Sequence, residues 1–118
     1  MGDLSRNFST SEFRDRRTGE VKVDPVLVDR LEKLRALIGD RPITIISGYR
    51  SRSTNTAVRG AKLSQHVMGR AVDIPFGVAT VQQAMTAGFK GIGSRGVWAV
   101  HVDVRPSSRV VTWSYGSY

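Results

Sequence analysis

The stretch 64–73, SQHVMGRAVD, leads from a polar turn into a short apolar run, and it carries His66 seven residues ahead of Asp73. The chain has only two histidines, and the second, His101, precedes Asp103 by two residues in another apolar run. Both histidines therefore lie close to aspartates, in or beside strand-like segments. We interpret this arrangement as a metal site, and we expect hydrolytic chemistry from it.

Length and composition bound the organisation of the chain. With 118 residues, 40% of them hydrophobic and 24% charged, we expect residues 1–118 to form one globular domain that acts as a monomer. No run of about 18 apolar residues occurs, so no transmembrane helix is expected. Residues 1–7 lack the apolar segment of a signal peptide. The chain would then work in the cytoplasm, be exported by another route, or have lost a natural leader.

Cysteine usage and charge narrow the chemistry. The chain has no cysteine, which excludes disulfides, thiolate ligands and a cysteine nucleophile, so nitrogen and oxygen atoms must hold any metal. The net charge of +8 favours polyanions such as nucleic acid, anionic lipid or an anionic cell wall. The 14 arginines are spread along the chain and match no nucleic-acid-binding motif. We therefore expect no nucleic-acid partner, and the hypothesis of one rests on charge alone.

Capping patterns and an apolar stripe predict the helices. Asp24 and Pro25 suit the N-cap and the first position of a helix that ends at Gly39. Its apolar residues recur at helical spacing, at Leu27, Leu31, Leu34 and Ile38. Shorter helices are predicted to start within 9–12 and to cover 80–88.

Runs of β-branched and apolar residues predict the strands, at 42–47, 71–76, 91–93, 97–104 and 109–113. A turn is predicted at 94–96, and an irregular or briefly helical excursion at 51–63. The order of these elements is typical of a small α+β domain with a mostly antiparallel sheet and flanking helices.

Alternation along the run 97–104 divides its side chains between two faces, because side chains two residues apart share a face of a strand. The face directed into the core should carry Val100, Val102 and Val104, and the opposite face His101, Asp103 and Arg105. Such a strand has an apolar back and a front equipped for chemistry.

Asp73 lies between two apolar residues, where burial of an aspartate is costly without a cation or strong donors. Gly69 allows a tight turn before it. Simpler interpretations stay open, namely a histidine with ordinary hydrogen bonds, or an aspartate paired with Arg70 or Arg105. If a metal is present, zinc fits best, because three nitrogen and oxygen ligands leave a position for water. Zinc acidifies that water, and a nearby carboxylate is still wanted to carry protons.

The stretch 64–73 resembles the SxHxxGxAxD motif of the zinc D-Ala-D-Ala metallopeptidase family, whose fold is related to hedgehog and lysostaphin-type domains. Residues 47–51, SGYRS, look like the segment of the same letters in that family. Residues 101–105, HVDVR, look like the closing HxDxR of its carboxypeptidase-like branch, and 8–13, FSTSEF, like the N-terminal FSxxEF of that branch. The likeness covers nearly the whole chain in order.

The resemblance implies roles for five residues. His66, Asp73 and His101 would be the zinc ligands. Arg50 would hold substrate and stabilise the developing oxyanion, and Ser64 would line the substrate site. The family cleaves peptides of bacterial peptidoglycan, typically next to D-amino acids, as D-Ala-D-Ala carboxypeptidases, as endopeptidases or as phage endolysins. The positive charge would favour the anionic wall.

The chain departs from the family pattern at one position. Some relatives carry a catalytic acid three residues before the last histidine, where this chain has Trp98. Asp103 is our candidate for the general base. Its rival roles are to orient a ligand histidine, or to form a salt bridge with Arg105. This departure keeps a second function open, a zinc-containing module that binds cell wall or protein without catalysis.

Overall fold

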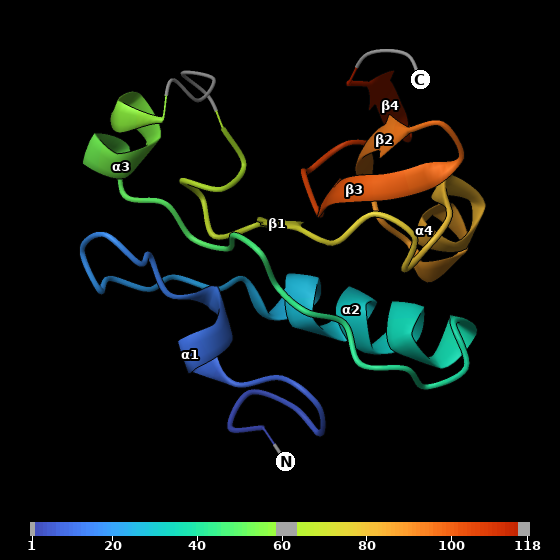
Figure 1. Cartoon of the computed structure of the whole chain (residues 1–118), viewed down its shortest axis with the longest axis horizontal. Coiled ribbons are helices and arrows are strands. Elements are labelled where there is room, and N and C mark those ends of the chain that lie inside the picture. Colours follow the sequence, from blue (N-terminus) through green and yellow to red (C-terminus); the bar gives the residue numbers. More distant parts are fainter. Residues whose placement is uncertain (1, 59–63, 116–118) are drawn as a thin grey trace.

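The computed structural model describes residues 2–58 and 64–115, and Figure 1 shows their arrangement. The helices are α1 (Thr10–Phe13), α2 (Pro25–Leu37), α3 (Arg52–Ala57) and α4 (Val81–Ala87). The strands are β1 (Ala71–Asp73), β2 (Gly91–Arg95), β3 (Trp98–Asp103) and β4 (Val111–Ser114). Within the described residues, no helix is long and apolar enough to cross a membrane.

The strands form one sheet in the order β1-β3-β2-β4. The pairings of β1 with β3 and of β2 with β3 are antiparallel, whereas β4 lies parallel to β2. The chain is therefore an α+β domain with a four-stranded mixed sheet, and the predicted antiparallel character holds for two of its three pairings.

Local signals placed the two longer helices correctly. The Asp24 carboxylate accepts a hydrogen bond from the Val26 N–H of α2 (2.9 Å). The turn after α2 contains Gly39 in the left-handed conformation, with φ of 79°. Thr80 and Gln83 form the predicted capping box of α4, in which the side chain of each accepts from the other's N–H (3.1 and 2.9 Å).

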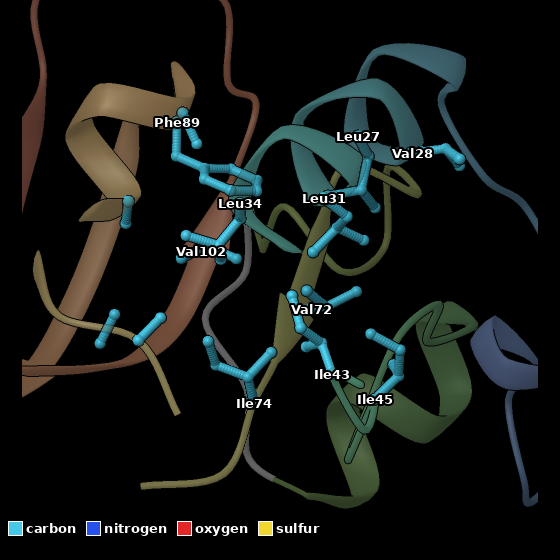
Figure 2. Close-up of a cluster of buried hydrophobic side chains, with 14 of the residues drawn as sticks. Leu27, Val28, Leu31, Leu34, Ile43, Ile45, Val72, Ile74, Phe89 and Val102 are labelled. Atoms are coloured by element: carbon cyan, nitrogen blue, oxygen red, sulfur yellow. The ribbon is translucent and has the colours of Figure 1, made fainter. Parts of the chain in front are cut away.

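The core lies between α2 and the sheet. Figure 2 shows Leu27, Leu31 and Leu34 of α2 facing Val72 of β1 and Val102 of β3. All of these side chains are at most 1% exposed. The apolar stripe of α2 therefore covers the back of β1 and β3, which leaves their other face for the chemistry.

The predicted strand at 42–47 is wrong. Within this run only Ser47 makes a β-bridge, to Asp73, and residues 42–46 belong to no strand. The guanidinium of Arg16 donates to the carbonyl oxygens of Ile45 (3.1 Å) and Ile46 (2.7 Å). These acceptors are thus taken by a side chain, and Ile45 itself is buried in the core.

Other strand boundaries also differ from the prediction. β1 ends at Asp73, ahead of Pro75, which has no N–H for a ladder. β2 continues to Arg95, and the hairpin turns at residues 96–97 instead of 94–96. β4 begins at Val111, two residues later than predicted.

A β-bulge breaks the alternation of β3. Gly93 pairs with His101 and Ser94 with Ala99, so Val100 has no partner in β2. Ala99 and Val102 are fully buried in the core, whereas Val100 is half-buried and turned to the site face. The predicted inward direction of Val100 is therefore wrong, because the extra residue rotates the strand locally.

Candidate metal centre

The turn that precedes β1 orients His66. Gly69 closes this turn with φ of 71°, a backbone conformation that glycine adopts without strain. The Nδ1 of His66 lies 2.7 Å from the carbonyl oxygen of Gly48. A carbonyl can only accept, so Nδ1 carries the hydrogen, and Nε2 of the neutral ring keeps its lone pair. This Nε2 lies 3.2 Å from Oδ1 of Asp73.

β3 presents the second histidine with the opposite nitrogen. The Nε2 of His101 lies 2.8 Å from Oδ2 of Asp103, and its Nδ1 lies 3.1 Å from Oδ1 of Asp73. Nε2–H donates to the Asp103 carboxylate, which leaves Nδ1 as the free nitrogen. The two histidine rings meet edge to face, with centroids 5.2 Å apart.

Arg105 holds the carboxylate of Asp103 through three hydrogen bonds. Arg105 donates Nε–H to Oδ1 (2.9 Å) and Nη2–H to Oδ2 (2.7 Å), and its backbone N–H also reaches Oδ1 (3.1 Å). Asp103 has no exposed surface. The result is a fixed chain of contacts from Arg105 through Asp103 to His101.

Asp73 joins the two histidines. Its Oδ1 faces both free ring nitrogens, while Oδ2 accepts from Nη2 of Arg50 (3.1 Å). The three candidate ligand atoms, one from each of His66, Asp73 and His101, lie within 4.8 Å of one another. Two imidazole nitrogens and one carboxylate oxygen form a donor set that fits zinc with an open position.

Hydrogen bonds outweigh burial in setting the charges of the site. Burial alone would raise the pKa of Asp73, but contacts with His101 and His66 hold it well below the usual range. Burial likewise works against ionisation of Asp103, and the hydrogen bonds of Arg105 and His101 lower its pKa instead. For His101, burial opposes the charged form, yet Asp103 and Asp73 raise its pKa. Protons therefore compete with a metal for the ring of His101, and this competition grows as the pH falls.

Two glycines of β2 make room for the site, and the sequence reasoning missed them. Gly91 pairs with Asp103 and Gly93 with His101. A Cβ at Gly91 would lie 2.2 Å from both carboxylate oxygens of Asp103. The sequence does contain a pattern that matches this arrangement, GxG at 91–93 and HxD at 101–103. The two segments can be matched residue by residue only once the register of the hairpin is known.

Trp113 of β4 is a further side chain that the sequence reasoning missed. It pairs with Gly93, and a Cβ at Gly93 would lie 2.8 Å from the indole nitrogen. Because β2 has no side chain there, the Trp113 ring reaches that of His101, with centroids 5.2 Å apart. The Arg105 guanidinium lies over the indole, 5.0 Å from its centre.

A pocket of about 1040 Å³ opens on this centre. Arg50 and Ser64, for which the family resemblance implies a place in the substrate site, line it together with the three candidate ligands. Ser64 also accepts the His66 N–H through its hydroxyl (3.2 Å). Asp103 lies behind His101, outside the lining. Over residues 2–58 and 64–115, Asp73 is the only carboxylate in the lining, and Arg50, Arg95 and Arg105 are its cations.

The family assignment follows from comparison with known proteins. Residues 6–103 match the model of the peptidase family described as Peptidase M15. The chain belongs to this family, which confirms the resemblance seen in its motifs.

Two similar proteins carry names that refer to peptidoglycan and to D-Ala-D-Ala. The chain is 40% identical over 108 residues to peptidoglycan L,D-endopeptidase MepK of Escherichia coli (strain K12), a region covering 80% of this chain and 59% of that protein. It is 39% identical over 67 residues to the zinc D-Ala-D-Ala carboxypeptidase of Streptomyces albus G, covering 53% of this chain and 26% of that protein. The chain thus spans less than two thirds of these relatives.

Proposed function

We propose that the chain is a zinc-dependent peptidase that cleaves the stem peptides of bacterial peptidoglycan. The observation that carries this proposal is the triad of His66, Asp73 and His101, which lines an open pocket. The names of both relatives support the substrate class. The 118 residues would form one peptidase domain of the hedgehog/D-Ala-D-Ala peptidase type, acting as a monomer.

The metal ligands would be Nε2 of His66, Nδ1 of His101 and Oδ1 of Asp73. The second nitrogen of each histidine is already engaged by a fixed acceptor, as in zinc sites where outer partners set the tautomer. Bound zinc would supply an acidified water and a Lewis acid for the peptide carbonyl. The chain itself holds these three ligand atoms in place and excludes other tautomers.

Arg50 would bind the substrate beside the metal. Its guanidinium reaches Oδ2 of Asp73 with Nη2 (3.1 Å) and the Ser47 hydroxyl with Nε (3.3 Å). Five N–H donors leave capacity for a substrate carbonyl whose oxygen gains negative charge during the reaction. Ser64 would line the same wall of the pocket.

Asp103 would act through His101 rather than as the general base. Its two oxygens are engaged by Arg105 and by Nε2 of His101, and it has no exposed surface. A base must reach the attacking water directly or through one water molecule. This geometry favours orientation of a ligand histidine over proton transfer, and the salt bridge with Arg105 supports that orientation.

The test is digestion of purified peptidoglycan with the zinc-loaded protein, with and without a chelator, followed by mass spectrometry of the released muropeptides. We expect chelator-sensitive products that His66→Ala abolishes. Loss of a terminal D-Ala would identify a carboxypeptidase, and cleavage at an internal peptide bond would identify an endopeptidase of endolysin or cellular type. Stoichiometric zinc without any product would overturn the enzymatic proposal.

That last outcome would favour a second function, a zinc-containing module that binds cell wall or protein. The observation in its favour is that Asp73 is the only carboxylate among the described residues that line the pocket. Sedimentation of the inactive protein with purified cell walls would then measure the binding directly.

A further inference from the structure

An apolar surface borders the candidate metal centre within the pocket. We call it the apolar shelf, and it consists of Ile46, Phe76 and Val100. Ile46 is 47% exposed and Phe76 is 58% exposed, whereas Val100 is half-buried. Large apolar side chains that gather inside a pocket, and not singly on the surface, are typical of a binding site.

Backbone contacts tie the shelf to the metal ligands. The Ile46 N–H donates to the carbonyl of Asp73 (2.9 Å), and the Ile74 N–H donates to the carbonyl of Val100 (3.0 Å). Val100 also directly precedes His101. The shelf therefore starts beside two of the three candidate ligands, so a group bound near the metal can extend along it.

The bulge in β3 creates the shelf. Regular alternation would bury Val100, but the extra residue turns it to the pocket and keeps Ala99 and Val102 in the core. Bulges next to active sites commonly re-aim a side chain in this way. An apolar residue is thus withdrawn from the core to face the pocket.

A cation lies across the hairpin from the aromatic ring that Phe76 contacts. Phe76 contacts the Trp98 ring, with centroids 6.1 Å apart, and Trp98 pairs with Arg95 across the hairpin. Arg95 is exposed and lines the same pocket. Its guanidinium carries a permanent positive charge and five N–H donors in a planar fork, a geometry that matches a carboxylate.

We infer that the apolar shelf is the subsite for an aliphatic side chain of the substrate residue held at the metal, and that Arg95 selects a carboxylate at the end of that side chain. This inference rests on the proposed function, because the metal anchors the peptide. It adds a specificity to the reaction, since neither the triad nor Arg50 distinguishes one side chain from another.

The test uses hydroxamic acids with unbranched alkyl tails of increasing length, which anchor to zinc and place the tail in the pocket. We expect the affinity for the zinc-loaded protein, measured by calorimetry, to rise about threefold to fourfold per methylene group over the first few carbons. Ile46→Ser and Phe76→Ser should flatten this rise, and Phe76→Leu should keep it. The control is Val97→Ser, since Val97 is 65% exposed and outside the lining.

A second series carries a carboxylate at the end of each tail. At the length that spans the shelf, the carboxylate should improve affinity roughly fivefold over the methyl-ended tail, as expected for a partly desolvated ion pair. Arg95→Gln should remove this preference, and Arg109→Gln, at an exposed arginine outside the lining, should not.

Affinity independent of tail length, or a rise that both serine variants leave unchanged, would overturn the shelf. Equal affinity of the two series at every length would overturn the role of Arg95. These binding measurements do not require turnover, so they separate the two proposals. If the zinc-loaded protein binds the tails but cleaves no peptidoglycan, the proposal of the subsite stands and the proposal of a peptidase fails.

Discussion

The two histidines of the candidate metal centre are held in different ways. His66 lies in a turn and donates to a backbone carbonyl, that of Gly48, whereas His101 lies in a strand and donates to the carboxylate of Asp103. Both contacts select a tautomer, but only the carboxylate adds a charge that raises the basicity of the ring. The neutral backbone thus orients His66, whereas a charged carboxylate both orients His101 and raises the basicity of its ring.

The supports behind the two histidines differ as well. On the His66 side, the buried carboxylate of Asp15 accepts the N–H groups of Ser51 and Arg17 (both 2.8 Å), and so holds the segment that carries Gly48 and Arg50. On the His101 side, the support is the sheet, with Gly91 and Gly93 leaving space for side chains of neighbouring strands. The His66 side thus depends on a loop that one carboxylate holds, whereas the His101 side depends on a strand that the register of the sheet holds.

Removal of either histidine should have the same effect on the metal site, although the two are held differently. His66→Ala and His101→Ala should each abolish stoichiometric zinc binding and lower peptidase activity roughly a thousandfold, because metal supplies several kcal/mol of transition-state stabilisation. Elemental analysis and muropeptide release measure the two effects. Retention of full zinc occupancy by either variant would contradict the ligand assignment.

Gly91→Ala should damage the strand side most severely without touching a ligand. The new Cβ would meet both oxygens of Asp103, so the buried ion pair with Arg105 must break or shift. We expect a loss of about 3 kcal/mol or more in the free energy of unfolding. Urea denaturation of the metal-free protein measures it.

Gly48→Ala is the matched variant on the loop side. Its Cβ would lie 2.8 Å from the backbone of Phe13, and a helix end can yield more readily than a paired strand. We expect a loss of about 1–2 kcal/mol. A larger loss for Gly48→Ala than for Gly91→Ala would reverse the proposed order of rigidity.

Asp103→Asn should separate orientation from proton transfer. As the partner of a ligand histidine, Asp103 should contribute about 10–100-fold in zinc affinity, and the amide should lose most of that contribution. Competition with a fluorescent zinc chelator gives the affinity. Unchanged zinc affinity, together with loss of the acidic limb of the pH–rate profile, would instead establish Asp103 as the base.

Asp15→Asn should weaken the loop side in a pH-dependent way. Burial opposes ionisation of Asp15, but hydrogen bonds from Ser51 and its neighbours lower the pKa well below the usual 3.8. A lowered folded-state pKa stabilises the protein above pH 3.8, and this stability declines as pH falls below it. We expect Asn to cost about 1–2 kcal/mol at pH 7.

The pH series is its own control for Asp15. The difference between the wild-type protein and Asp15→Asn in thermal unfolding should shrink steadily below about pH 4. A constant difference from pH 7 to pH 3 would mean that the carboxylate charge does not stabilise the loop.

Local patterns determined much of this molecule. The caps of α2 and α4 were predictable because Asp24, Thr80 and Gln83 act on backbone groups two or three residues away. The shared face of His101 and Asp103 followed from the period of a strand, which a bulge at Val100 leaves intact beyond it. Family motifs singled out the three residues that now meet within 4.8 Å.

Tertiary structure decided what depends on partners far along the chain. Arg16 occupies the carbonyls of Ile45 and Ile46, so a β-branched run with strand propensity forms no ladder. The bulge that exposes Val100 arises from the register between β2 and β3. Likewise, the engagement of Asp103 with Arg105 and His101 depends on the space above Gly91. A side chain's chemistry is written in the sequence, but its role depends on which groups the fold brings against it.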